Sequence, residues 1–315
     1  MKIEFVPKVF TSAHNTVIGR ANALIDYYND LGLKLTLRQI YYQFVAEAWI
    51  PNNLNQYKRL SDILNDARLA GRVDWNAIID RTRFLRGQTY WDDPEEAVDN
   101  LAERYMRDPW NEGQEYYFEL WEEKDALIGV VQPTCDRLRI NYFSCRGYVS
   151  ASAIYQASRR IGRKIREGYK VVILHMGDHD PSGVQMSQDN IDRLAMLMGT
   201  TDFDFKRIAL NMKQIEKYKP PPNYAKIGDT RKRAYVERFN TEECWELDAL
   251  KPDVIDEIIA KHVEPHILQE PWDETMQRET EERELFEEIR DNWELVKLRP
   301  WEWPEPKDEE EDNEK

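Results

Sequence analysis

The chain has 315 residues, of which 41% are hydrophobic and 33% charged, and its formal net charge is −15. This length allows two domains with separate cores, and no stretch is long and apolar enough to cross a membrane. The N-terminus carries an early acidic residue and no apolar segment typical of a signal peptide, so we expect a cytoplasmic protein. Three scattered cysteines form no C-x-x-C pair, which argues against structural zinc or a disulfide framework and favours buried thiols.

The beginning of the chain is predicted to be helical. Its three helices are predicted at residues 13–31, 37–49 and 54–70. Thr36 is a good N-cap for the second helix, and the third has a basic outer face. Three short helices of this kind resemble a helix-turn-helix or winged-helix unit, with residues 73–85 as the wing. The pattern alone favours an ordinary three-helix bundle with a solvated polar face, and the alternative is a winged-helix-like DNA-binding domain at residues 1–90, which the resemblance described below supports. The residues predicted to contact DNA are Lys58, Arg68, Arg72, Arg81 and Arg83.

Two adjacent tyrosines on the second helix differ in their expected surroundings. At about 100° per residue, Tyr41 lies about 40° from the centre of the apolar face and Tyr42 about 140° from it. We therefore predict that Tyr41 belongs to the core and that Tyr42 lies on the flank of the helix. Arg38 is on the same flank, one turn before Tyr42. The apolar face consists of Leu37, Ile40, Tyr41, Phe44 and Ala48.

After a predicted linker helix at residues 91–112, strands and helices alternate. The unbroken apolar run at residues 171–174 is typical of a strand buried on both faces, as in a parallel sheet. The alternation predicts an α/β domain at residues 113–240, with a Rossmann-like parallel sheet flanked by helices. The other strands are predicted at residues 115–121, 139–144 and 204–210, and helices at 150–167 and 184–198.

The last part of the chain is strongly acidic. Residues 264–315 contain 20 acidic and 7 basic residues, and so carry −13 of the net charge. The body of the protein is therefore close to neutral, and the first ninety residues are mildly basic, with 12 basic and 8 acidic residues. We predict a helical extension at residues 241–300 and a disordered acidic tail at residues 301–315.

Two acidic residues, Asp178 and Asp180, follow the apolar run where the next helix begins. Open α/β sheets bind ligands at this edge. Two carboxylates about 4 Å apart repel each other by roughly 4 kcal/mol at an effective dielectric of 20, so the pair requires a shared proton or a cation. Oxygen ligands of this kind favour a hard ion such as Mg²⁺. The alternative is that the segment is only a turn and a helix cap, with Asp180 as the N-cap and Pro181 in the first turn.

A third acid, Glu123, follows an earlier predicted strand. A glutamate at one strand end together with Asp178-x-Asp180 at another resembles the Toprim domain. This domain is the metal-binding module of topoisomerases, bacterial primases and some nucleases.

The N-terminal part narrows the resemblance. Residues 38–42, Arg-Gln-Ile-Tyr-Tyr, are similar to the Arg-x-x-Tyr-Tyr motif in the A subunit of topoisomerase VI and the related meiotic double-strand-break transesterase. Residues 123–125, Glu-Lys-Asp, resemble the family's Glu-Lys-Glu, and residues 177–183 its Asp-x-Asp-Pro-x-Gly. The resemblance covers residues 10–215, in the family's order of a winged-helix domain followed by a Toprim domain. Residues 147–150, Gly-Tyr-Val-Ser, depart from the family's Gly-Tyr-Pro-Asp, and the chain is closer to stand-alone bacterial or viral relatives.

The resemblance implies Mg²⁺-dependent cleavage of double-stranded DNA by tyrosine transesterification, as in the A subunit of a type IIB topoisomerase. Tyr42 would be the nucleophile, and Arg38 would favour its phenolate or hold the scissile phosphate. Glu123, Asp178 and Asp180 would hold Mg²⁺, with Glu123 also taking part in catalysis. In the relatives the tyrosine of one subunit meets the metal of the other, which implies a homodimer. The sequence contains no P-loop, so an ATPase (B-type) subunit would be a separate chain.

Two other functions remain open at this point: a Toprim-type nuclease without a covalent intermediate, and a non-catalytic DNA-binding subunit. In either case Tyr42 would be a half-buried tyrosine on a DNA-binding helix. A primase is disfavoured, because no zinc-binding cysteine cluster accompanies the acids. His179 is expected to lie beside the site or in solvent rather than to bind a metal.

Overall fold

The computed structural model describes residues 2–79, 90–224 and 231–293. The chain divides into two compact units. The first unit combines residues 1–85 with residues 113–268, and the second combines residues 86–112 with residues 269–315. None of the helices in the described ranges has the length and apolar character needed to cross a membrane.

The N-terminal part of the first unit is helical, as predicted. Its helices are α1 (Ser12–Asp30), α2 (Leu37–Ala46) and α3 (Leu54–Leu69). Thr36 caps α2 through a capping box, in which its side chain and that of Gln39 each accept from the other's backbone N–H. The apolar faces of the three helices enclose one core, in which Ile40, Phe44 and Leu64 are fully buried.

The wing predicted at residues 73–85 is not confirmed. Within its described part, residues 73–79, the backbone makes a single bridge between Ile78 and Leu35. The remainder, with Arg81 and Arg83, lies outside the described residues. Over the described residues, this part of the chain is a three-helix unit.

The predicted parallel sheet is confirmed. Its strands are β1 (Tyr116–Glu122), β2 (Asn141–Ser144), β3 (Lys170–Met176) and β4 (Asp204–Ala209). All neighbours are parallel, in the order β2-β1-β3-β4, which is compatible with a Rossmann-like α/β fold. Glu122 at the end of β1 is level with Ser144 of β2 and Met176 of β3, so these three strands end at one edge of the sheet.

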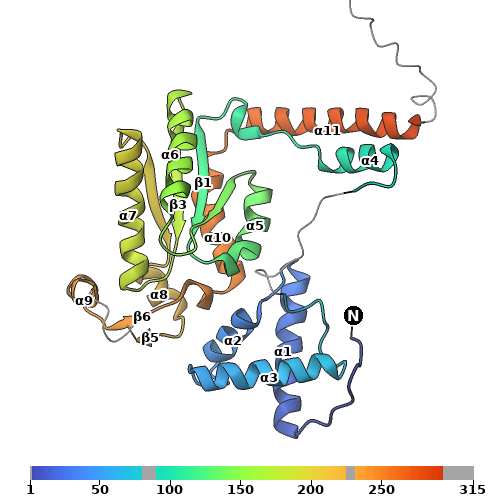
Figure 1. Cartoon of the computed structure of the whole chain (residues 1–315), viewed down its shortest axis with the longest axis vertical. Coiled ribbons are helices and arrows are strands. Elements are labelled where there is room, and N and C mark those ends of the chain that lie inside the picture. Colours follow the sequence, from blue (N-terminus) through green and yellow to red (C-terminus); the bar gives the residue numbers. More distant parts are fainter. Residues whose placement is uncertain (1, 80–89, 225–230, 294–315) are drawn as a thin grey trace, which may run out of the picture. The chain divides into compact units, whose positions relative to one another are not determined.

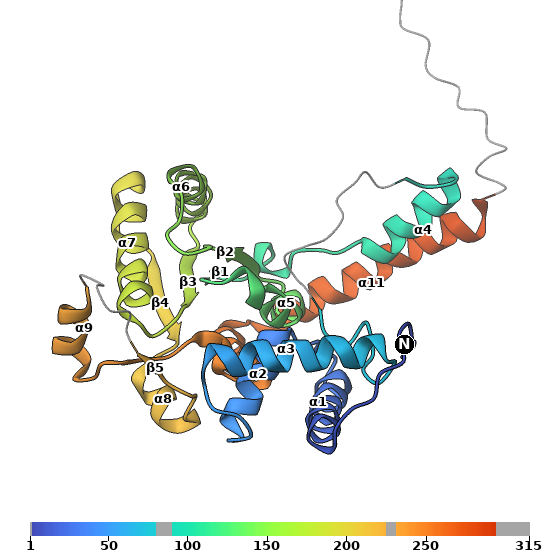
Figure 2. The ribbon, with the colours of Figure 1, turned by 60° about the horizontal axis from the view of Figure 1, so that its bottom comes forward.

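Helices cover both faces of this sheet (Figures 1 and 2). On one face lie α6 (Ala151–Arg166) and α7 (Pro181–Met198), and on the other α5 (Ile128–Arg137) and α10 (Pro252–Val263). Side chains of Trp121 and Ile173 meet Ile161 of α6, while the alternate strand residues Leu120 and Leu174 are buried toward the opposite face. The three cysteines are buried and free, as predicted.

Shorter elements complete both units. The first unit also contains α8 (Met212–Tyr218), α9 (Lys232–Phe239), the antiparallel pair β5 (Asn223–Tyr224) and β6 (Glu243–Cys244), and the 3₁₀ turns η2 (Asp125–Leu127), η3 (Leu247–Ala249) and η4 (Glu264–His266). The second unit contains α4 (Pro94–Arg104), η1 (Pro109–Asn111) and α11 (Gln269–Asp291). There α4 and α11 lie side by side (Figure 1), and Arg107 donates to both carboxylate oxygens of Glu282 at 2.7 and 2.6 Å.

The segment of residues 245–249 joins the sheet edge to the helical part of the first unit. The backbone of Trp245 exchanges two hydrogen bonds with that of His179, at 2.8 and 3.0 Å. The N–H of Leu247 donates to Asp178 Oδ1 at 2.8 Å. Ala249 then belongs to the core of the three N-terminal helices. One short segment therefore fixes α2 against the end of β3.

Glu119, in the middle of β1, is a buried carboxylate surrounded by donors. It is 1% exposed and accepts from Tyr117 Oη at 2.7 Å and Trp121 Nε1 at 2.9 Å. Arg160 of α6 donates to both of its oxygens, at 2.7 and 2.9 Å. The guanidinium of Arg160 supplies the positive charge that compensates this carboxylate and fastens α6 to the sheet.

Replacing Arg160 by alanine should lower the free energy of unfolding by about 3 kcal/mol, because it leaves the Glu119 carboxylate buried without its cation. Urea unfolding followed by circular dichroism measures this loss. The matched control is Arg163→Ala on the same helix, where the arginine is 64% exposed and pairs with Glu167 at the surface. That variant should change stability by less than about 1 kcal/mol. Equal losses in the two variants would contradict this role of Arg160.

Candidate active site

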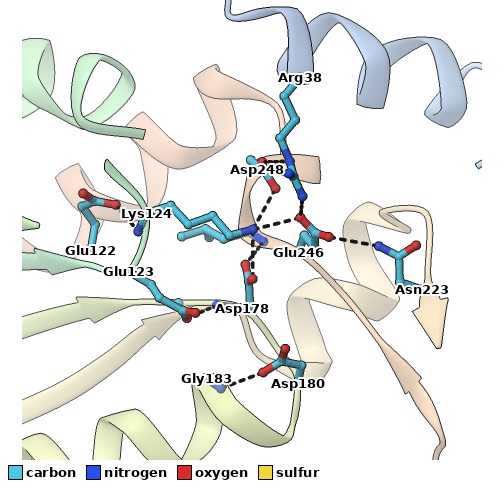
Figure 3. Close-up of polar contacts among 12 residues, drawn as sticks. Arg38, Glu122, Glu123, Lys124, Asp178, Asp180, Gly183, Asn223, Glu246 and Asp248 are labelled. Carbon is cyan, nitrogen blue, oxygen red and sulfur yellow. Dashed lines mark hydrogen bonds and ion pairs between the residues drawn. The ribbon is translucent and has the colours of Figure 1, made fainter. Parts of the chain in front are cut away.

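The three predicted metal ligands come to the same edge of the sheet. Glu123 follows β1, and Asp178 and Asp180 follow β3 (Figure 3). The backbone N–H of Asp178 donates to Glu123 Oε2 at 2.9 Å. Asp180 Oδ1 accepts from the N–H of Gly183 at 2.6 Å, so Asp180 is the N-cap of α7, as predicted.

Two glycines permit this close approach of backbone and carboxylate. A Cβ on Gly183 would lie 2.3 Å from the carbonyl oxygen of Asp178 and 3.0 Å from Glu123 Oε2. A Cβ on Gly177 would lie 2.7 Å from the same Glu123 oxygen. Gly177 and Gly183 are therefore required by the close packing of Glu123 and of the Asp178 carbonyl against them.

Lys124 supplies a cation to this edge. Its ammonium lies 2.9 Å from Asp178 Oδ2, 2.9 Å from Glu246 Oε2 and 3.2 Å from Asp248 Oδ1 (Figure 3). The Asp248 side chain is 2% exposed and that of Asp178 10%. Three largely desolvated carboxylates thus share one ammonium, and they hold more negative charge than it can balance.

Arg38 of α2 brings the second cation. Its Nε lies 2.6 Å from Asp248 Oδ2, and its Nη2 donates to Glu246 Oε2. The same Nη2 donates to Tyr42 Oη at 3.3 Å. A continuous polar network therefore runs from the acid edge to the candidate nucleophile. We call it the Arg38–Lys124 network; its members are Tyr42, Arg38, Glu246, Asp248, Lys124 and Asp178.

Sequence reasoning missed Glu246 and Asp248 as members of the site. Their spacing, Glu246-Leu-Asp248, repeats that of Asp178-x-Asp180, and this was the available signal. They follow β6, a strand of two residues, so no long apolar run marks the position as a sheet edge.

The prediction that Tyr41 lies in the core and Tyr42 on the flank of α2 is wrong. Tyr41 is 5% exposed and Tyr42 4%, and both belong to the core of the N-terminal helices. The flank of α2 that carries Tyr42 is covered by η3, about 200 residues later in the chain, which a helical wheel cannot take into account. Tyr42 nevertheless borders a cavity of about 250 Å³. Other residues that line it include Arg38, Asn52, Tyr57, Asn223 and Glu246.

The structure describes three of the five residues predicted to contact DNA. Lys58 and Arg72 are exposed. Arg68 instead donates to the carbonyls of Trp75, at 3.2 Å, and Ile78, so its guanidinium holds the segment after α3 in place. Arg81 and Arg83 lie outside the described residues.

Burial and neighbouring charges shift the pKa values of the carboxyl groups in the site. Burial, together with the neighbouring carboxylate of Asp178, raises the pKa of Glu123 to about 7. Burial raises the pKa of Asp178 to about 6, although the ammonium of Lys124 opposes it. Burial acts upward on Glu246 as well, but Lys124 and Arg38 outweigh it and hold that pKa at about 2.

Tyr42 is held in its phenol form. Burial, and then the charge of Asp248, raise the pKa of Tyr42 well above its usual value, and Arg38 offsets only part of this rise. The predicted help of Arg38 to a phenolate is thus weakened here, because two carboxylates already share its charge.

The oxygen atoms and the negative charge of the three predicted ligands at this edge suit a hard cation. All three predicted ligands are carboxylates, and burial raises the pKa values of Glu123 and Asp178, so a bound cation would stabilise their charged forms. In the arrangement described, however, no three histidine, cysteine or acidic side chains converge closely enough to hold a metal, over the ranges given above. Asp178 turns toward Lys124 and Asp180 toward the start of α7. These side chains would have to turn to bind an ion together.

His179 lies beside the edge but takes no part in it. The residue is 2% exposed, and its Nδ1 shares a hydrogen bond of 2.6 Å with Tyr235 Oη. The rings of Phe239 and Trp245 enclose it further. Burial lowers the pKa of His179 to about 4, so it is a neutral packing residue.

No family model matches this chain, and no curated protein matches it.

The raised pKa of Glu123 predicts a pH-dependent stability. A carboxyl group whose folded pKa is about 7 retains its proton on folding between about pH 4.5 and 7, while the unfolded chain has lost it. In the presence of a chelator, the free energy of unfolding should therefore fall as pH rises through this window. Glu123→Gln removes this titrating group. Between pH 5 and pH 8, its free energy of unfolding should therefore rise by ~2 kcal/mol relative to that of wild type. Urea unfolding at the two pH values measures the difference.

The control for this experiment is Glu237→Gln, at a side chain that is 63% exposed. Its pH dependence should follow that of wild type. If the free energy of unfolding of Glu123→Gln depended on pH as that of wild type does, burial would not raise the pKa of Glu123. Adding Mg²⁺ at pH 8 should stabilise wild type more than Glu123→Gln, because the ion stabilises the charged form of the edge.

Proposed function

We propose that the protein is a Mg²⁺-dependent DNA strand-cleaving transesterase, with Tyr42 as its nucleophile and the acids of the sheet edge as its metal ligands. The observation that carries the proposal is the Arg38–Lys124 network, since it connects Tyr42 to Asp178 through four side chains. The resemblance to the Toprim and Arg-x-x-Tyr-Tyr motifs of the topoisomerase VI A family supports the same assignment.

In the proposed step, Tyr42 Oη forms a bond to the phosphorus of a DNA phosphodiester, while the bond from that phosphorus to one deoxyribose oxygen breaks. The phenol proton leaves Tyr42, and the released deoxyribose oxygen takes up a proton, so no oxidant or further reactant is needed. The phosphotyrosyl bond retains the energy of the broken bond, and the reverse attack reseals the strand.

Arg38 and Lys124 prepare the site for a phosphate. A phosphate oxygen accepts charge-assisted hydrogen bonds as a carboxylate does, so DNA entering beside Tyr42 competes with Glu246 for Arg38. Released from its carboxylate partners, Arg38 would act fully on the phenol and lower its pKa. The cavity of about 250 Å³ beside Tyr42 provides an approach to the hydroxyl.

The acids of the edge would take the metal-binding role. Glu123, Asp178 and Asp180 would hold Mg²⁺, which when bound polarises the phosphate and stabilises the leaving oxygen. To hold the ion, Asp178 Oδ2 would have to give up its contact with the ammonium of Lys124. Lys124 remains held by Glu246 and Asp248, so it need not leave the site.

The wider setting follows from the resemblance. We propose double-stranded DNA as the substrate, a homodimer in the cytoplasm as the active form, and a separate chain as the source of any ATPase activity. A winged-helix character of the N-terminal helices, with Lys58 and Arg72 on DNA, is part of the same proposal.

A second candidate is a nuclease that uses the same acids with water as the nucleophile. The burial of Tyr42 and its raised pKa favour this alternative, because both oppose attack by a phenolate. In that case Tyr42 and Arg38 are structural, and hydrolysis depends only on Glu123, Asp178 and Asp180.

Covalent trapping separates the two functions. Supercoiled plasmid is incubated with the protein and Mg²⁺ and quenched with denaturing detergent. Wild type should leave protein attached to the cut ends, and Tyr42→Phe should reduce this attachment at least 100-fold, roughly the loss expected when a nucleophile is removed. Asp178→Asn should abolish both cutting and attachment.

Tyr41→Phe is the matched control, because the hydroxyl of Tyr41 donates a hydrogen bond to Asn52 Oδ1 at 2.9 Å and, unlike that of Tyr42, is not bound to Arg38. It should still give an adduct. Cut DNA with free ends, unchanged in Tyr42→Phe, would establish the nuclease. DNA binding with neither cutting nor attachment, unaffected by Asp178→Asn, would indicate a non-catalytic subunit.

A further inference from the structure

We infer that a cavity between α6 and α7 binds a phosphomonoester, the doubly charged phosphate group found on a nucleotide or at the 5′ end of a DNA strand. The two helices lie side by side on one face of the sheet (Figure 1). The cavity has a volume of about 250 Å³ and lies by the C-terminal ends of both helices. It is roughly 25 Å along α7 from Asp180 at the acid edge, so it is separate from the proposed cleavage site.

The cavity is lined by positive charge that no neighbour balances. Of the described residues around it, only Arg159 and Arg166 are charged, and no described group pairs with either side chain. Their spacing of seven residues, about two helical turns, places both on the same face of α6. The guanidinium of Arg166 turns back along the helix, since its Nη1 lies 3.4 Å from the position that a Cβ on Gly162 would take. Gly162 is midway between the two arginines, so they border the space that its missing side chain leaves open.

The helix dipole alone does not explain these two arginines. Basic residues in the last turn of α6 suit the negative end of the dipole, and Arg166 belongs to that turn. Arg159 lies two turns earlier and gains nothing from it. The carboxylate next in sequence, that of Glu167, is already bound, with Lys164 Nζ at 3.1 Å and Arg163 Nε at 3.7 Å. The charge of both arginines is therefore available to an external anion.

The chemistry of the lining selects the kind of anion. Guanidinium groups bind phosphate oxygens through paired, charge-assisted hydrogen bonds. A phosphomonoester carries a charge of about −2 at neutral pH, which matches two arginines, whereas each phosphodiester of a DNA backbone carries about −1. The hydroxyl of Thr200 accepts from the N–H of Asp202 at 3.1 Å, so its own proton remains to be donated. The side chains of Ile165, Leu197 and Met198 supply an apolar surface for the organic part of the ligand.

Methyl resonances of ¹³C-labelled methionine report binding at this cavity, because Met198 lines it and Met186, on the same helix, does not. The variant Met198→Leu assigns the resonance. Full-length protein is titrated in EDTA with adenosine 5′-monophosphate, or with a trinucleotide that carries a 5′-phosphate. Adenosine and the same trinucleotide with a 5′-hydroxyl are the controls. We expect the Met198 resonance to shift in a saturable way with one or both phosphorylated probes and with neither control.

Replacing Arg159 and Arg166 together by glutamine should weaken this binding at least 100-fold, roughly tenfold for each charge-assisted contact that is lost. Both side chains are exposed, so the double variant should keep the thermal unfolding curve of wild type. The matched control is Arg163→Gln, because Arg163 is exposed on the same helix but does not line the cavity. This control should bind the probes as wild type does.

The two phosphorylated probes distinguish the sources of the phosphate. A shift with the nucleotide alone would identify a free nucleotide, and a shift with the trinucleotide alone would identify a DNA end. A Met198 resonance that stays in place at millimolar concentrations of both probes would overturn the inference. Equal binding of the unphosphorylated controls, or undiminished binding in the double variant, would overturn it as well. No cleavage is measured and no Mg²⁺ is present, so these outcomes do not depend on the proposed function.

Discussion

The ammonium of Lys124, shared by Asp178, Glu246 and Asp248, is the interaction on which the site depends. It sits between two acid pairs that are about 70 residues apart in the sequence, and without it their carboxylates would repel one another at low dielectric. Arg38 completes the compensation from α2. Ion pairs as well as apolar packing therefore hold the helical part against the sheet edge. The apolar contact is the packing of Ala249 into the core of the N-terminal helices.

The same interaction makes the edge responsive to ligands. Its carboxylates exceed its cations, so a divalent ion is favoured wherever the side chains can turn to meet it. Its cations are held by carboxylates, so a phosphate that binds Arg38 would leave Glu246 and Asp248 paired with Lys124 alone. The proposed binding of DNA would therefore depend on this exchange of partners at the site rather than on the net charge of −15.

Local signals predicted a large part of this arrangement. Thr36 and Asp180 were identified as caps from residue type and position, and the parallel sheet from an unbroken apolar run. Glu123 and Asp178 were each predicted to follow a strand, and the resemblance to the Toprim domain implied that they act together. The contacts that sequence reasoning missed are those between distant segments. The burial of Tyr42 depends on η3, and the inward turn of Arg68 depends on Trp75 and Ile78, which no periodicity within one helix reveals.

The central claim is that Tyr42 and the acid edge form one site around a divalent cation. The most direct test incorporates 3-fluorotyrosine at Tyr42 alone and follows its fluorine resonance during titration with paramagnetic Mn²⁺ in place of Mg²⁺. The account predicts that one equivalent of Mn²⁺ broadens the resonance strongly, and that Asp178→Asn removes the effect. A resonance that stays sharp while Mn²⁺ binds, or broadening that survives Asp178→Asn, would contradict it.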